Sequence, residues 1–105
     1  MYTIINEKKY QIIPYSTFKN KLKGLMLKKK PIKEIYLFNN CHSIHTFFMK
    51  QKIDICFLDK NYKILKKYEN QGKNKIIIGK GTYTLEMPLK TAKYLKIGDT
   101  IKIKK

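Results

Sequence analysis

Short apolar runs separated by polar turns dominate the 105-residue chain, and this pattern is typical of β-strands. The clearest strand is Ile53 to Leu58, and Asp59 to Asn61 follow it with the chemistry of a tight hairpin turn. A partner strand from Tyr62 to Tyr68 is expected to run antiparallel to it. Further strands are expected over residues 2–5, 10–13, 34–38, 45–49, 76–78, 82–87 and 100–104.

Two stretches have helical spacing instead. Ser16 can cap a short helix that ends near Gly24, and Pro88 suits the first turn of a second helix. The inward positions would be Phe18, Leu22 and Leu25 in the first helix, and Leu89, Ala92 and Leu95 in the second. We therefore expect a mostly β protein (β-rich α+β), a compact single-domain antiparallel barrel or sandwich with two short helices.

Alternation along the later strands predicts which side chains face the core. In the strand after Asn61, Tyr62 and Ile64 fall on one face with Lys66 and Tyr68, so the far end of that strand should be exposed. In the last expected strand the isoleucines point inward and the lysines outward. At the other end of the chain, residues 1–13 are expected to form a hairpin that Pro14 ends.

One domain is expected for residues 1–105, because this length supports one hydrophobic core and no linker interrupts it. Apolar residues make up 43% of the chain, which argues against disorder. No apolar run approaches the roughly 20 residues of a membrane-spanning helix. The first residues lack the layout of a signal peptide, so we expect a cytoplasmic protein.

The basic balance is the strongest feature of the composition. The chain has 24 basic and 7 acidic residues, a net charge of +17, and every basic residue is lysine. Such a charge would draw the protein to nucleic acid, anionic lipid or an acidic polymer. Arginine, which makes most bidentate contacts to phosphate and guanine, is absent. We therefore favour compositional drift, in which lysine accumulates at solvated positions, over a dedicated nucleic-acid surface. If such a surface exists, the lysine clusters at residues 28–30 and 102–105 are its best candidates.

Two cysteines, Cys41 and Cys56, are too few for a disulfide framework and lack the spacing of a structural zinc site. In a reducing compartment both should be thiols. Cys56 lies in an apolar strand, so we interpret it as a small core residue. Cys41 lies among polar residues before a strand and stays a more open case.

Five elements occur in the order and spacing of a known family: residues 23–26 (KGLM), 43–49 (SIHTFFM), 53–59 (IDICFLD), 85–86 (LE) and 98–99 (GD). This ordered set resembles the uncharacterised bacterial and archaeal family called domain of unknown function 192. The resemblance covers about residues 15–104 and leaves the N-terminal hairpin outside it. It implies a mostly β single domain with no established reaction, and we expect no cofactor.

The expected strand at residues 45–49 places His45, Phe47 and Met49 on one face, with Cys41 just upstream. Cysteine, histidine and methionine suit copper(I), or zinc when a carboxylate joins them. We favour the plainer interpretation, in which Phe47 and Met49 fill the core and His45 makes one buried hydrogen bond. The spacing matches no known ligand signature, so Cys41 and His45 are the only metal candidates and no metal site is assigned.

Asp54 is the most informative single residue, because a carboxylate inside an apolar strand needs partners. In the structural interpretation, which we favour, it accepts amide hydrogen bonds and fixes the link at residues 50–52. In the functional interpretation it orients His45 as a base, or forms a carboxylate pair with Glu86.

Three functions remain open. The first is a small non-enzymatic binding or accessory module for a peptide, protein or small ligand, with an acidic partner favoured by the lysines. Its groove would involve His45, Phe48, Met49, Asp54 and Glu86. The second is a metal-binding or hydrolase-like site, for which His45, Asp54, Glu86 and Cys41 would converge on one pocket. The third is nucleic-acid or anionic-surface binding, which needs a continuous lysine stripe with exposed aromatic residues.

Overall fold

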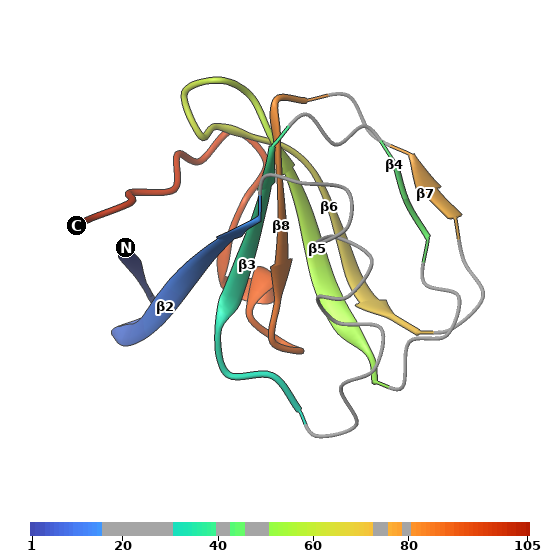
Figure 1. Ribbon diagram of the computed structural model, residues 1–105, viewed down its shortest axis with the longest axis horizontal. Helices are drawn as coiled ribbons and strands as arrows, with labels where there is room; N and C mark the ends of the chain where they lie inside the picture. Colours follow the sequence, from blue (N-terminus) through green and yellow to red (C-terminus); the bar gives the residue numbers. More distant parts are fainter. Residues whose placement is uncertain (16–30, 40–42, 46–50, 73–75, 79–80) are drawn as a thin grey trace.

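The computed structural model describes residues 1–15, 31–39, 43–45, 51–72, 76–78 and 81–105 (Figure 1). Its elements are β1 (Tyr2–Ile5), β2 (Lys8–Tyr15), β3 (Ile35–Asn39), β4 (Ser43–His45), β5 (Ile53–Leu58), β6 (Ile64–Gln71), β7 (Ile76–Ile78), β8 (Tyr83–Met87) and one 3-10 turn, η1 (Ala92–Tyr94). The protein is mostly β, as predicted. β5 and β7 have the bounds that the apolar runs predict, and β1, β3 and β8 differ from them by a residue or less at each end.

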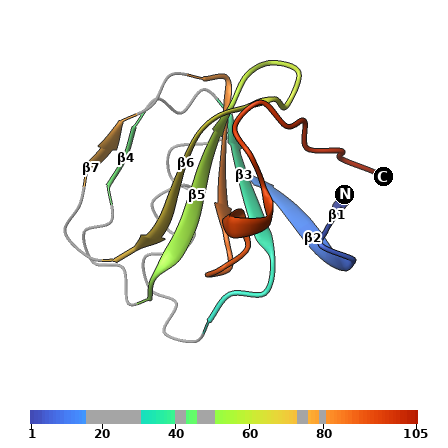
Figure 2. The same cartoon turned by 180° about the vertical axis from the view of Figure 1, so that it is seen from behind.

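Six strands form one sheet in the order β1-β2-β3-β8-β5-β6, and β4 pairs with β7 in a separate two-stranded sheet. The two-stranded sheet lies on the β6 side in both views (Figures 1 and 2). All neighbouring strands are antiparallel except β2 and β3, which are parallel, so the expectation of a purely antiparallel fold was wrong. A parallel pair needs a long connection, and nineteen residues separate Tyr15 from Ile35.

The opening hairpin is present as predicted, but its turn has two residues and not the four, 6–9, that separate the two expected strands. Asn6 and Glu7 both have positive φ, 50° and 67°, which is the backbone of the turn type that joins two twisted strands. Pro14 does not end the second strand, however. β2 continues through Pro14 to Tyr15, where it runs along β3.

The six-stranded sheet is open, which corrects the expectation of a barrel. β1 and β6 are its two ends, and the C-terminal segment crosses between them (Figure 2). One bridge joins Thr100 to Lys63 beside β6, and another joins Lys104 to Tyr2 in β1. The strand expected over residues 100–104 is therefore two isolated bridges. Between them Ile101 is buried against the sheet, as alternation predicts.

Neither predicted helix is present as an α-helix in the part of the chain that the structure describes. The first, over residues 16–25, lies outside the described residues. The second is reduced to η1, because Lys90 has a positive φ of 71° and Leu95 is already extended, so too few residues share helical geometry. Ala92 and Leu95 are buried as predicted, but Leu89 is exposed.

Two hydrophobic cores cover the two faces of the sheet. β5 divides its side chains between them, and all six are buried because a core covers each face of the sheet at this central strand. The first core contains Ile5, Tyr10, Ile12, Ile35, Leu37, Cys56, Leu58, Ile64, Leu85, Met87, Ala92, Leu95 and Ile101. The second core contains Ile32, Tyr36, Phe38, Ile53, Ile55 and Phe57.

Two irregularities interrupt the pairing of β6 with β5 and overturn the predicted facing of its side chains. One lies between the pairs Leu58–Ile64 and Phe57–Lys66, where Leu65 has no partner. This extra residue reverses the alternation, so Tyr68 contacts the second core while Ile64 belongs to the first. Lys67, not Lys66, therefore falls on the same face as Ile64, opposite Cys56.

We expect Gly81→Ala to destabilise the fold by about 1–3 kcal/mol. A Cβ at this position would lie 2.5 Å from the carbonyl oxygen of Leu58, which belongs to the backbone of the central strand β5 and cannot move cheaply. Urea unfolding measures the loss. Gly72→Ala is the matched control, because its nearest neighbour is a flexible Lys52 carbon at 3.6 Å and its stability should change by less than about 0.5 kcal/mol. Equal effects of the two substitutions would contradict the close approach of Gly81 to the Leu58 carbonyl group.

Candidate functional site

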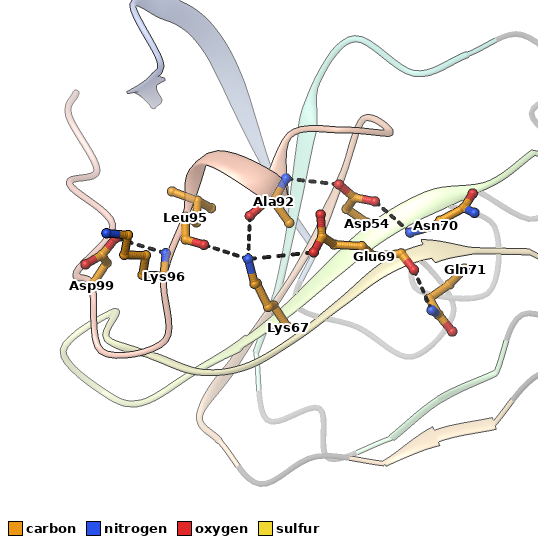
Figure 3. A network of polar contacts seen from close by, with 9 residues as sticks. All are labelled: Asp54, Lys67, Glu69, Asn70, Gln71, Ala92, Leu95, Lys96 and Asp99. Atoms are coloured by element: carbon orange, nitrogen blue, oxygen red, sulfur yellow. Dashed lines mark hydrogen bonds and ion pairs between the residues drawn. The ribbon is translucent and has the colours of Figure 1, made fainter.

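The carboxylate of Asp54 is buried on the first-core face of β5, with 1% of the residue exposed. Its Oδ1 accepts a hydrogen bond from the backbone N–H of Asn70 at 2.9 Å, and its Oδ2 accepts one from the N–H of Ala92, also at 2.9 Å. Both oxygens are thus satisfied by amides from two other segments (Figure 3). This agrees with the structural interpretation of Asp54, although the amides come from β6 and η1 and not from the link at residues 50–52.

The Asn70 amide lies at the second irregularity of β6. Ile53 pairs with Gln71 and Ile55 with Tyr68, so two residues of β6 lie opposite Asp54 alone. Asn70 has a φ of 57°, a left-handed conformation that asparagine tolerates better than most residues. The hydrogen bond from Asn70 to Asp54 therefore holds the bulge in a defined geometry.

Lys67 in β6 binds the η1 segment that Asp54 also contacts. Its Nζ donates to the carbonyl oxygens of Ala92 at 3.1 Å and Leu95 at 2.8 Å, and it lies 3.7 Å from a carboxylate oxygen of Glu69 (Figure 3). The backbone of Ala92 is thus held at its N–H by Asp54 and at its C=O by Lys67. Sequence reasoning missed Lys67, because the bulge at Leu65 turns inward a residue that simple alternation turns outward.

Two further aspartates hold exposed turns in a similar way. Asp59 Oδ1 accepts from the backbone N–H groups of Asn61 at 2.8 Å and Lys63 at 3.0 Å. Asp99 Oδ2 accepts from the N–H of Lys96 at 3.0 Å and closes the turn after η1. Short acidic side chains favour such local hydrogen bonds, so all three aspartates of the chain serve the backbone.

Cys56 is buried in the first core, which confirms its interpretation as a small core residue. Burial raises the pKa of its thiol to about 12, and the neighbouring charge of Asp54 adds to the effect. The nucleophilic form of cysteine is the thiolate, so this thiol is unsuited to nucleophilic chemistry near neutral pH.

Glu86 lies on the opposite face of the sheet from Asp54. Its cross-strand neighbours are Tyr36 in β3 and Ile55 in β5, both members of the second core, and only 6% of the residue is exposed. Desolvation raises the pKa of its carboxyl group to about 8, so Glu86 is mostly protonated at neutral pH. A carboxylate pair of Asp54 and Glu86 is excluded, because the sheet separates them.

His45 belongs to a different sheet from Asp54. It ends β4 and pairs with Ile76 of β7, and the structure describes its backbone only. Cys41, Phe48 and Met49 lie outside the described residues. Within those residues, no three histidine, cysteine, aspartate or glutamate side chains form a group that could hold a metal ion. The described helical content also includes no helix that could span a membrane.

Comparison with known proteins identifies a family and a shared fold. The family model of domain of unknown function 192, described as "Uncharacterized ACR", matches residues 2–103, which confirms the resemblance drawn from the motifs and extends it over the opening hairpin. A proposed transcription regulator from Sinorhizobium meliloti has a similar structure, with a TM-score of 0.80 and 18% identity over 96% of this chain and 89% of that one. A protein of unknown function from Novosphingobium aromaticivorans has a TM-score of 0.80 and 16% identity over 97% and 82%. A search of the curated proteins found no significant match.

We expect Asp54→Asn to destabilise the protein by about 2–4 kcal/mol, measured by urea unfolding. Asparagine has one side-chain acceptor oxygen, whereas Asp54 uses both of its oxygens, so one buried N–H would face an NH₂ group. Asp59→Asn is the matched control. Asp59 accepts both of its hydrogen bonds with Oδ1 alone, which asparagine can do as well, so its loss should stay below about 1 kcal/mol. Equal losses would contradict the assigned role of Asp54.

Glu86 should make the stability depend on pH. In the unfolded chain its carboxyl group titrates near 4.5, and in the folded protein near 8, so the unfolded state loses its proton first as the pH rises. Stability is therefore expected to fall through this window, by up to roughly 1.4 kcal/mol per pH unit, and to level off above it. Glu86→Gln cannot ionise and should remove this part of the pH dependence. Unfolding of both proteins between about pH 5 and about pH 9 tests this, and parallel curves would contradict it.

Proposed function

The chain belongs to the family of domain of unknown function 192, whose name assigns no activity, and from this premise we propose that it is a small non-enzymatic binding module for a negatively charged partner. One observation carries the proposal: six of the seven acidic side chains have a partner or are buried in the fold, whereas among the lysines that the structure describes only Lys67 has an acidic partner. The charge of +17 is then available for an intermolecular contact.

All seven acidic residues lie in the described parts of the chain, and six of them have a structural environment. Asp54, Asp59 and Asp99 accept backbone amides, Glu69 pairs with Lys67, Glu34 accepts a hydrogen bond from the Tyr36 hydroxyl at 3.4 Å, and Glu86 is buried. Glu7 alone is exposed in the opening turn without such a contact. Of the lysines in these same ranges, only Lys67 lies within ion-pair distance of a carboxylate.

The positions of the candidate catalytic residues favour binding over catalysis. Asp54 accepts backbone amides with both of its oxygens, and Glu86 faces the other core. These two residues therefore do not share one site, and Cys41 lies outside the described residues. His45, Phe48 and Met49 remain candidates for a contact surface, and Asp54 is removed from that group because it is buried and both of its oxygens accept backbone amides.

Binding of a negatively charged polymer tests the proposal. We expect saturable binding to at least one of three probes, namely poly-glutamate, a single-stranded oligonucleotide and vesicles containing an anionic lipid. Binding should weaken steeply as salt increases, because the contacts are between charges. The control is the same chain unfolded in urea, which keeps the lysines but loses their arrangement. If the folded protein binds no probe more tightly than the urea-unfolded chain at the same salt concentration, the lysines are only compositional and the proposal fails.

A further inference from the structure

Exposed apolar side chains gather in one short loop, residues 88–99, which we call the anchored loop. Among the described residues, the exposed large hydrophobic side chains are Met1, Ile4, Leu65, Leu89, Tyr94 and Ile97. Half of these belong to the anchored loop, where Leu89 is 41%, Tyr94 49% and Ile97 63% exposed. Side chains exposed to this degree project from the surface and do not line a groove.

The fold holds this loop from beneath. Ala92 and Leu95 are buried in the first core, and Asp54 and Lys67 bind the backbone of Ala92 from β5 and β6 (Figure 3). Asp99 closes the end of the loop through the N–H of Lys96. The exposed side chains are therefore presented by a fixed backbone, which lowers the entropy cost of binding through them.

Lysines alternate with the exposed apolar side chains. Lys90, Lys93 and Lys96 are all exposed, and the Nζ of Lys93 lies 5.0 Å from the centre of the Tyr94 ring. The only acidic residue in the loop is Asp99, whose carboxylate accepts the Lys96 amide. The anchored loop therefore combines three projecting apolar groups with three lysines that have no carboxylate within ion-pair distance in the described parts of the chain.

We propose that the anchored loop docks on the surface of an anionic lipid bilayer. Leu89 and Ile97 would enter the boundary between headgroups and acyl chains, Tyr94 would lie at the headgroup level, and the lysines would contact lipid phosphates. This inference deepens the proposed function, because it names the negatively charged partner. Nucleic acid is less suited to this surface, since phosphates and bases give no burial to two projecting aliphatic side chains.

The test uses the full chain and large vesicles of phosphatidylcholine, with or without phosphatidylglycerol. We expect cosedimentation with the anionic vesicles only. Leu89→Ser with Ile97→Ser should weaken binding at least about tenfold, because apolar burial is lost. The matched control is Ile4→Ser with Leu65→Ser, which removes two exposed apolar side chains elsewhere and should change binding less than about twofold.

Charge is tested with two triple variants that lose the same number of lysines. Replacing Lys90, Lys93 and Lys96 with glutamine should weaken binding at least about tenfold, since each lysine near an anionic surface contributes separately. Replacing Lys102, Lys104 and Lys105 with glutamine should have a clearly smaller effect. Equal effects of the two triple variants would overturn the anchored loop as the docking surface and leave a diffuse charge attraction.

A reporter makes the result independent of variants that fold poorly. The chain has no tryptophan, so Ile97→Trp places a single fluorophore at the most exposed apolar position of the loop. We expect its emission to shift to shorter wavelength with anionic vesicles and not with neutral ones. The absence of a shift in a folded variant would overturn the proposal.

The outcomes also separate this inference from the proposed function. Binding to poly-glutamate or to the oligonucleotide without vesicle binding overturns the lipid partner and leaves the binding module standing. Binding to none of the three probes overturns both.

Discussion

The hydrogen bonds of one buried carboxylate, that of Asp54 in β5, hold the bulge of β6 and attach η1, which no strand pairing joins to the sheet. Removing an ionised carboxylate from water is costly unless strong partners replace the water. Here two backbone amides do so, and hydrogen bonds to a charged acceptor are stronger than neutral ones. Because the amides belong to Asn70 and Ala92, the same group fixes the bulge of β6 and seats η1 on the sheet.

Lys67 completes this arrangement from the neighbouring strand. It lies opposite Cys56, on the same face of the sheet as Asp54. Its Nζ donates to the carbonyl groups of Ala92, which begins η1, and of Leu95, which follows it. The connection from β8 to the C-terminal segment contains only the short turn η1, and polar contacts from Asp54 and Lys67 hold it on the sheet. The C-terminal segment in turn bridges both ends of the open sheet, so the seating of η1 bears on the enclosure of the first core.

The use of acidic residues within the fold also explains the positive charge of the surface. Acidic residues are few, and the fold uses nearly all of them to satisfy backbone groups, to pair with Lys67 or in the second core. Apart from Lys67, the lysines in the described parts of the chain consequently have no partner of opposite charge. A field of one sign reduces stability through self-repulsion, but it attracts an oppositely charged partner and speeds the encounter. The exposed apolar groups of residues 88–99 add a short-range contact to this long-range attraction.

Local patterns predicted the strands well, since β5 and the opening hairpin follow directly from runs of apolar residues and turn residues. They also predicted that Asp54 accepts amides, but not which ones, because the donors lie 16 and 38 residues away in sequence. Alternation failed in β6, where Leu65 adds an unpaired residue that no local signal marks. The helical spacing after Pro88 failed because Lys90 has a positive φ and Leu95 is extended, which leaves only a single turn between them. Separation of His45 from Asp54 into two sheets depends on pairing partners, which a pattern of residues does not contain.

Amide hydrogen exchange at Asn70 and Ala92 tests whether Asp54 is a structural carboxylate that holds two segments. If it is, both amides exchange only through global unfolding, with protection close to that of the β5 backbone, despite lying in a bulge and a short turn. Exchange at the rate of exposed turn amides would contradict it, because the two hydrogen bonds would then be absent from the protein in solution.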